Sequence, residues 1–224
     1  MVDNEERVPA IDVQNQGDAL QVHQLGLDLA DGRHLLTNAE MTVEEGERVM
    51  LSGRSGSGKS TLLRAMGHLW PAGHGSIRLP AARYLFLPQK PYLPIGTLRE
   101  ALSYPQAGDT YPNERYVHVL ETCRLPHLVA RLDEANHWQR LLSPGEQQRL
   151  AFARALIYAP QWLYMDEATS AMDEEDEASL YQALIDELPG LSIISVGHRS
   201  SLKRFHPRHI RIENGRLVDQ AVTA

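Results

Sequence analysis

The chain has 224 residues, a length that suits one domain, or one domain with a small inserted lobe. Hydrophobic residues make up 42% of the chain, which is enough for a core, and the net charge of −7 argues against a nucleic-acid binder, which usually presents a basic face. Cys123 is the only cysteine, which excludes a disulfide framework and a cysteine-rich zinc site. No stretch approaches the roughly 18 apolar residues of a membrane-spanning helix.

Residues 1–19 are polar and acidic, and they lack the positive and apolar regions of a signal peptide. We predict that they form a linker or a ragged end, and that residues 20–224 form the domain. Residues 20–50 alternate apolar with polar positions and turn at Asp31-Gly32 and Glu45-Gly46. This pattern predicts a small antiparallel β subdomain at the start of the domain.

The central residues alternate between strands and helices. Apolar strands are predicted over 47–52 and 82–89, a helix over 60–69, and a short strand after a Gly/Pro-rich break within 71–80. Residues 90–158 have a different character and predict an inserted helical lobe, with helices over 114–125 and 126–133 and after the capping residues Thr97 and Ser143.

The last third of the chain returns to alternation. It predicts an apolar strand ending in acids within 161–173, a helix over 174–188 capped by Asp173, a buried strand over 191–198, and a hairpin over 209–218 that turns at Asn214-Gly215. Strand–helix alternation predicts a parallel sheet, with functional side chains beyond the carboxyl ends of its strands.

Residues 53–60, GRSGSGKS, fit the phosphate-loop pattern G-x-x-x-x-G-K-[ST] at every fixed position. The glycines let backbone N–H groups turn towards phosphate oxygens, Lys59 adds a positive charge for the β- and γ-phosphates, and Ser60 supplies a hydroxyl to Mg²⁺. A Gly/Ser-rich turn that matched by chance would lack the strand before it and the helix after it. We therefore predict an α/β P-loop NTPase whose nucleotide contacts are Gly53, Ser55, Gly56, Ser57, Gly58, Lys59, Ser60 and Thr61.

Polar residues follow three further strands. In WLYMDE, Asp166 is predicted to hold Mg²⁺ and Glu167 to orient or deprotonate an attacking water. Taken alone, such a pair is more often the solvated end of a strand, and Gln89 and His198 alone would be ordinary polar residues. Because all four end strands of a sheet that also has a P-loop, we expect them to converge on one ligand.

The stretch LSPGE begins a well-capped helix. Ser143 is the expected N-cap, Pro144 occupies the first helical position, and Glu146 completes a capping box. The segment can be this and nothing more, or its free N–H groups can bind a phosphate.

In order and spacing, these motifs resemble the ATP-binding domain of ABC (ATP-binding cassette) transporters. The resemblance covers about residues 20–219 and depends on GRSGSGKS, the Gln89 loop, LSPGE, WLYMDE, SAMD at 170–173 and His198. The stretches FLPQKPYLPIGTLREALSYP and LSPGEQQRLAFARAL resemble the exporter-type branch, in which a permease and an ATPase share one chain. That branch includes peroxisomal acyl-CoA carriers and bacterial carriers of peptides or cobalamin.

The resemblance implies an ATP-hydrolysing motor that pairs head to tail with a second such domain around two Mg-ATP and drives a transmembrane permease at the cytoplasmic face of a membrane. Ser143, Gly145 and Glu146 would then meet the ATP bound by the partner's P-loop. The family's other roles fall on Glu167 as catalytic base, His198 and Lys59 at the γ-phosphate, Gln89 at Mg²⁺ and the permease, and Asp173 as the link between the two sites.

The chain departs from the family pattern in two places. The signature usually contains Gly and Gln where this chain has Pro144 and Glu146, so a carboxylate lies near the expected phosphate, and we expect its repulsion to be reduced if it folds back into the capping box. Many relatives stack adenine on an aromatic residue before the P-loop, where this chain offers Leu29 or, as the weaker candidate, His34.

The permease is absent from these residues, which favours an ATPase domain cut from a longer chain over a separate subunit. Two other functions stay open. The unusual LSPGE suits a low-turnover ATPase that regulates or assembles a partner. A soluble ABC ATPase linked to nucleic acid is the third, but the acidic balance and the lack of a coiled-coil insertion argue against it, so we predict no nucleic-acid partner.

Overall fold

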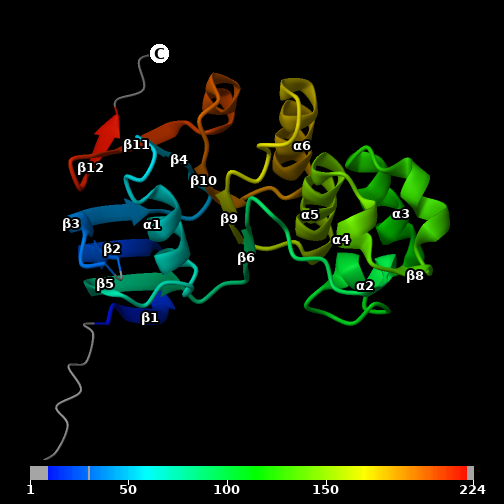
Figure 1. Cartoon of the computed structure of the whole chain (residues 1–224), viewed down its shortest axis with the longest axis horizontal. Coiled ribbons are helices and arrows are strands. Elements are labelled where there is room, and N and C mark those ends of the chain that lie inside the picture. The colour runs from blue at the N-terminus through cyan, green and yellow to red at the C-terminus, as the bar shows by residue number, and fades with distance from the viewer. Residues whose placement is uncertain (1–9, 30, 221–224) are drawn as a thin grey trace, which may run out of the picture.

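The computed structural model describes residues 10–29 and 31–220. Within them, a central sheet lies between a small second sheet and a helical lobe (Figure 1). One face of the central sheet packs into a core shared with helix α1 (Lys59–Met66) and the small sheet. The other face packs into a core shared with the lobe and with helix α6 (Glu174–Glu187).

The central sheet has six strands in the order β12-β11-β4-β10-β9-β6. All neighbouring pairs from β11 to β6 are parallel, and β12 joins β11 as an antiparallel hairpin. The predicted parallel core is therefore confirmed, and every residue of β9 and β10 is buried, as central strands require. The strands are β4 (Arg48–Gly53), β6 (Tyr84–Leu87), β9 (Trp162–Asp166), β10 (Ser192–Val196), β11 (Arg208–Glu213) and β12 (Arg216–Gln220).

The small sheet has the order β1-β5-β2-β3, with strands β1 (Asp12–Gly17), β2 (Leu20–Asp28), β3 (His34–Val43) and β5 (Gly73–Pro80). It is antiparallel, as predicted, except that β1 runs parallel to β5. The prediction that residues 1–19 are a linker is wrong for residues 10–19, because β1 is an edge strand and both Ile11 and Ala19 are buried. Residues 1–9 lie outside the described residues.

The helical lobe consists of α2 (Leu98–Ser103), α3 (Asn113–Thr122), the 3-10 helix η1 (Pro126–Arg131), α4 (Trp138–Leu141) and α5 (Pro144–Tyr158), with a two-stranded pair of β7 (Gly96–Thr97) and β8 (Ala135–Asn136). Thr97 caps α2, as predicted, and Glu100 completes a capping box there. Buried side chains such as Trp138, Tyr116 and Phe152 join the lobe to α5 and α6. A second 3-10 helix, η2 (Ser200–Phe205), follows β10.

Several predicted boundaries differ from the structure by a few residues, and three of these differences have a local cause. The helix predicted to end at residue 69 ends at Met66, because Gly67 takes the C-cap position. The strand predicted over 82–89 ends at Leu87, so Gln89 lies two residues beyond it, past Pro88. The segment 126–133 was predicted helical, and it is a 3-10 helix that Pro126 begins.

Candidate functional site

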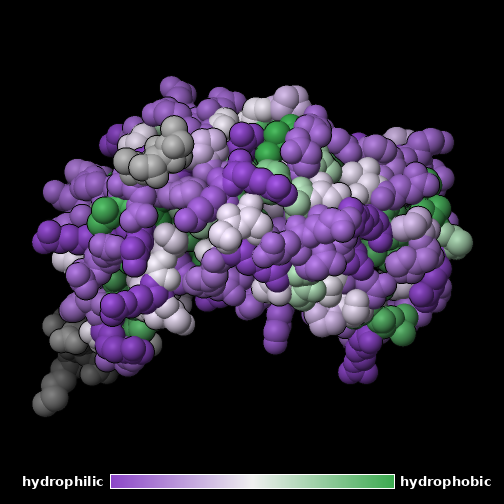
Figure 2. Space-filling model, turned by 90° about the horizontal axis from the view of Figure 1, so that it is seen from above, coloured by the Kyte–Doolittle hydropathy of each residue, from purple (hydrophilic) through white to green (hydrophobic). Residues whose placement is uncertain are grey.

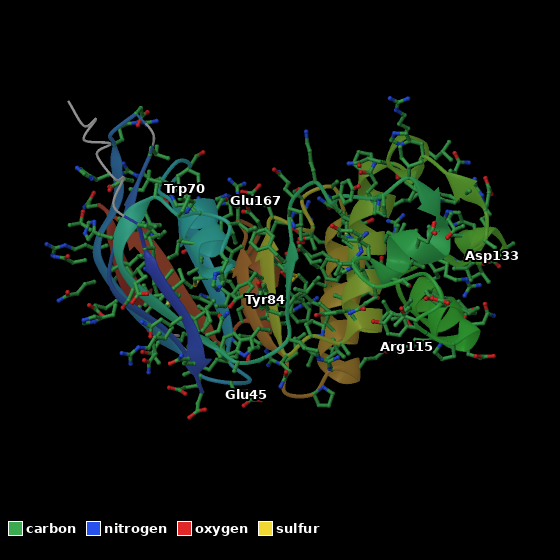
Figure 3. The ribbon with its side chains drawn as sticks, turned by 90° about the horizontal axis from the view of Figure 1, so that it is seen from below. Glu45, Trp70, Tyr84, Arg115, Asp133 and Glu167 are labelled. Carbon is green, nitrogen blue, oxygen red and sulfur yellow. The ribbon has the colours of Figure 1, made fainter. Side chains whose placement is uncertain are left out.

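The carboxyl ends of the parallel strands meet at one edge of the central sheet. Figure 3 shows Glu167, which follows β9, at this edge, and Glu45, which precedes β4, at the opposite one. The P-loop follows β4, the Gln89 loop follows β6, and His198 follows β10. The residues predicted to converge are therefore delivered to one edge by neighbouring strands.

The P-loop has the backbone that its glycines were expected to allow. Gly53, Gly56 and Gly58 have φ values of +145°, +75° and +99°, which residues with a side chain rarely adopt. Gly58 is the N-cap of α1, and because glycine has no side chain, the first N–H groups of this helix are left without a side-chain cap. The hydroxyl oxygen of Ser57 is buried without a hydrogen-bond partner among the described residues. Such an orphaned donor fits a loop that is completed by phosphate oxygens.

Lys59 points back into the P-loop. Its Nζ donates to the carbonyl oxygens of Gly53 at 3.1 Å and Arg54 at 3.0 Å. Burial lowers the pKa of Lys59, and the carboxylates of Glu167 and Asp166 oppose this shift. The ammonium is thus held ready at the centre of the loop by carbonyl groups, which it can exchange for phosphate oxygens.

Asp166 is joined to the P-loop helix by two contacts. Ser60 Oγ donates to Asp166 Oδ1 at 2.5 Å, and Arg64 Nη2 lies 3.3 Å from Asp166 Oδ2. A hydroxyl beside a buried carboxylate is a hard oxygen pair of the kind that Mg²⁺ prefers, so these residues fit the predicted metal role. Arg64 was not among the residues predicted from the sequence, although its position on α1, one turn after Ser60, places it on the same face of the helix.

The Glu167 carboxylate lies between Gln89 and His198. Gln89 Nε2 donates to Glu167 Oε2 at 3.1 Å, and His198 Nε2 lies 3.2 Å from Glu167 Oε1. Glu167 also has a φ of +51°, a left-handed conformation that a residue other than glycine adopts at a cost of about 1–3 kcal/mol. Such strain is typical of functional positions, because there the surroundings fix a side chain where the backbone alone would not put it.

The predicted capping box at the start of α5 is confirmed. Glu146 N donates to Ser143 Oγ at 3.3 Å, and Glu146 Oε2 accepts from Ser143 N at 2.9 Å. A Cβ on Gly145 would lie 3.0 Å from the Ala171 carbonyl oxygen, so this glycine allows close packing against the segment after β9. Asp173 caps α6 by accepting from Asp176 N at 2.7 Å.

The signature segment, residues 142–146, is not part of the cluster at the P-loop. Among the described residues, its side-chain hydrogen bonds reach Gln147, His127 and its own members, and none reaches residues 53–61. The structure therefore groups Gln89, Asp166, Glu167 and His198 with the P-loop, and leaves Ser143, Gly145 and Glu146 apart, on the helical lobe.

Gln148, which was not predicted from the sequence, connects these parts. The buried amide of Gln148, one turn into α5, donates to the Gln89 carbonyl oxygen at 2.9 Å and to Ser170 Oγ at 3.1 Å. Its oxygen accepts from Ala171 N at 2.9 Å. Helix α5, which begins at the signature, is thereby hydrogen-bonded both to the Gln89 loop and to the segment that follows Glu167.

A hollow of about 200 Å³ lies beside the P-loop. Its lining includes Leu29, Arg33 and Leu35 together with P-loop and α1 residues. Leu29, the preferred adenine neighbour, is thus at the hollow, whereas His34 pairs with Asp28 at 2.6 Å and does not line it. The glycine-rich loop between β4 and α1, with Ser60 hydrogen-bonded to the Asp166 carboxylate, defines the chain as a P-loop nucleotide-binding domain.

Comparisons with known proteins identify the family. Residues 36–170 match the ABC transporter family. An ABC transporter ATP-binding protein of Haemophilus influenzae is 44% identical over 183 residues, which cover 82% of this chain and 31% of that protein. The mouse lysosomal cobalamin transporter ABCD4 is 42% identical over 196 residues, which cover 81% of this chain and 32% of that protein. ABC transporter D family member 2 of Dictyostelium discoideum is 33% identical over 210 residues, covering 90% and 28%.

The chain belongs to the ABC transporter family and contains its ATP-binding domain, as the sequence analysis predicted. Members of this family hydrolyse ATP to power transport. The chain spans about a third of the length of the curated relatives that it matches. Among the described residues, none of the helices has the length and apolar character needed to cross a membrane.

Proposed function

We propose that this chain is the ATP-hydrolysing motor of a membrane transporter, and that it acts as a head-to-tail pair. The observation that supports this most is the division of the site. The P-loop cluster contains a base candidate, a metal pair and phosphate ligands, but the signature segment lies elsewhere on the chain. A second copy, turned end for end, would bring its signature to this copy's nucleotide.

In this proposal, Lys59, Ser57 and the P-loop N–H groups bind the phosphates. Mg²⁺, when bound, would neutralise charge between the β- and γ-phosphates, with Ser60, Asp166 and Gln89 as its ligands or water partners. Glu167 orients the attacking water and accepts its proton, and its hydrogen bond with Gln89 keeps the carboxylate at that position. His198 donates to the γ-phosphate oxygens, where charge builds up during transfer.

A surface that follows Gln89 in the chain is the candidate contact with the permease. Four large apolar side chains there are exposed: Tyr92 (58%), Ile95 (74%), Tyr104 (43%) and Leu141 (51%). The buried Arg154 holds the backbone under this surface in place, because its guanidinium donates to the carbonyl oxygens of Tyr92 and Ala101. The face of the molecule in Figure 2 is largely hydrophilic, with small separate hydrophobic areas. An apolar surface beside the Gln89 loop suits the permease, which would place the domain at the cytoplasmic face of a membrane.

Two measurements test the proposal. Mg²⁺-dependent ATP hydrolysis by the wild-type chain should fall about 10²–10⁴-fold in Glu167→Gln, the range expected when a general base is removed. The mass of Glu167→Gln in solution should rise from that of one 25.1 kDa chain to twice that value only when ATP and Mg²⁺ are both present. ATP binding with negligible turnover by the wild-type chain would instead favour a low-turnover regulatory ATPase. A persistent monomer would count against pairing by this chain alone.

A further inference from the structure

The carboxylate of Glu146 has more partners than a capping box supplies. Its Oε2 accepts from both Ser143 N at 2.9 Å and Ser143 Oγ at 2.7 Å. Its Oε1 lies 3.0 Å from His127 Nε2, which comes from η1, another element of the lobe. Each carboxylate oxygen therefore has a partner, and His127 is the side chain hydrogen-bonded to Oε1.

These contacts determine where the charge of Glu146 lies. Partial burial by itself would raise the pKa of Glu146, but the hydrogen bonds to Ser143 and then to His127 together outweigh it and lower the pKa, so the group is an anion at neutral pH. An anion at a helix N-terminus stabilises the helix, but it also repels any phosphate that approaches the same N–H groups. A positive or N–H-donating partner beside that anion reduces the repulsion.

We propose that His127 is a positioning residue of the signature segment. Its imidazole hydrogen-bonds to Glu146 Oε1 and offsets the charge of that carboxylate, so that the ATP bound by a second copy can dock on the N-terminus of α5. The inference rests on the proposed head-to-tail pairing, and it explains how a carboxylate is tolerated in that segment.

The geometry supports an effect on docking more than on folding. The side chain of His127 is 54% exposed, so its removal opens no cavity in the core. Glu146 is less exposed, at 23%, and keeps both bonds to Ser143 when His127 is absent. What changes is the compensation of charge at the docking surface.

The experiment is a double-mutant cycle in the Glu167→Gln background, which traps the ATP-bound pair. We would measure, by light scattering, the ATP concentration that gives half-maximal pairing for the parent, His127→Ala, Glu146→Gln and the combined variant. His127→Ala should raise this concentration about two- to five-fold, as expected for the loss of an exposed pair. In the Glu146→Gln background the same change should have no effect, because there is no charge to offset. His127→Gln, which still offers an N–H donor, should stay within about two-fold of the parent.

His118→Ala is the matched control. The side chain of His118, on α3, is 52% exposed, and its Nε2 lies 2.9 Å from a carboxylate oxygen of Glu187 on α6. It therefore resembles His127 in exposure and in pairing with a carboxylate from another element, but its partner is not in the signature segment. It should leave pairing unchanged. An equal rise for His127→Ala in both Glu146 backgrounds, or no rise in either, would overturn the inference while leaving the pairing intact. Absence of pairing in every variant would overturn both, and ATP hydrolysis by the wild-type chain would then show that the catalytic part of the proposed function stands.

Discussion

Ser60 Oγ donates a hydrogen bond of 2.5 Å to Asp166 Oδ1, although 106 residues separate the two in sequence. The contact joins the start of α1, which follows the phosphate loop, to the acidic end of β9 at the same edge of the sheet. A hydroxyl and a carboxylate at this distance can share one small divalent cation without moving the backbone.

Asp166→Asn should therefore lower Mg²⁺-dependent ATP hydrolysis by at least about 10²-fold. The reason is that Mg²⁺, which would stabilise the charge of the transferred phosphoryl group, is held less tightly when the carboxylate is replaced by an amide. Nucleotide binding measured in the presence of a chelator should change little, because the P-loop contacts remain. Asp133→Asn provides the control: Asp133 is ion-paired with Arg99 at 2.8 Å, 80% exposed, and far out on the lobe in Figure 3. Equal hydrolysis by both variants would contradict the assignment of Asp166.

Gln148→Leu should destabilise the fold and uncouple the lobe from Glu167. The substitution removes the partner of Ala171 N and of the Gln89 carbonyl oxygen, and each lost hydrogen bond lowers the free energy of unfolding by about 0.5–1.5 kcal/mol. The free energy of unfolding from urea titration, together with the rate of ATP hydrolysis, would measure both effects. Gln182→Leu, on the exposed side of α6, removes only a local bond to Asp186 and should change neither quantity.

Much of this site is encoded locally, which is why the sequence predicts it. The caps at Thr97, Ser143 and Asp173 depend on residues within three positions, and the glycines of the P-loop determine its backbone whatever the rest of the chain does. The strand end at Asp166 follows from an apolar run, whereas β10 ends at Val196, two residues before the predicted end at His198. In these cases the residue type and its near neighbours contain the whole instruction.

The features that the sequence did not predict depend on distant partners. Strand β1 has the polar sequence DVQNQG, without alternation, and it is a strand because β5, some 60 residues later, offers an open edge. Gln148 resembles any helical glutamine until Gln89 and Ala171 are placed beside it. His127 lacks a motif and gains a role only through its distance from Glu146.

Acid should destabilise the domain through His206. This histidine is fully buried, lies 2.9 Å from Ser195 Oγ and 2.8 Å from the Leu202 carbonyl oxygen, and burial lowers its pKa to about 4. Because the pKa in the unfolded chain is about 6.5, the unfolded state binds the proton first as the pH falls, and stability is lost between those two values.

The loss attributable to His206 should reach about 2 kcal/mol between about pH 7 and pH 5. Urea unfolding at both pH values would measure it. His206→Asn is expected to be less stable at both, but with a pH dependence smaller by that amount. His118→Gln, at an exposed histidine, should retain the full dependence, and the same dependence in His206→Asn would show that other groups cause it.

An aromatic side chain at position 29 should improve adenine binding. Leu29 and Leu35 line the hollow beside the P-loop, and Arg33 is the polar residue of the same wall. Stacking of a base on an aromatic ring contributes about 1–3 kcal/mol, whereas an aliphatic side chain offers only part of this contact. Leu29→Tyr should therefore tighten ATP binding at least about five-fold, as measured by calorimetry, and should tighten GTP binding by a similar factor, because every base has a face that can stack. His34→Tyr is the matched control, because the side chain of His34 is directed to Asp28 and lies outside the hollow. If His34→Tyr tightened ATP binding and Leu29→Tyr did not, the base would lie against the other side of this turn, and the hollow beside Leu29 would not be the adenine site.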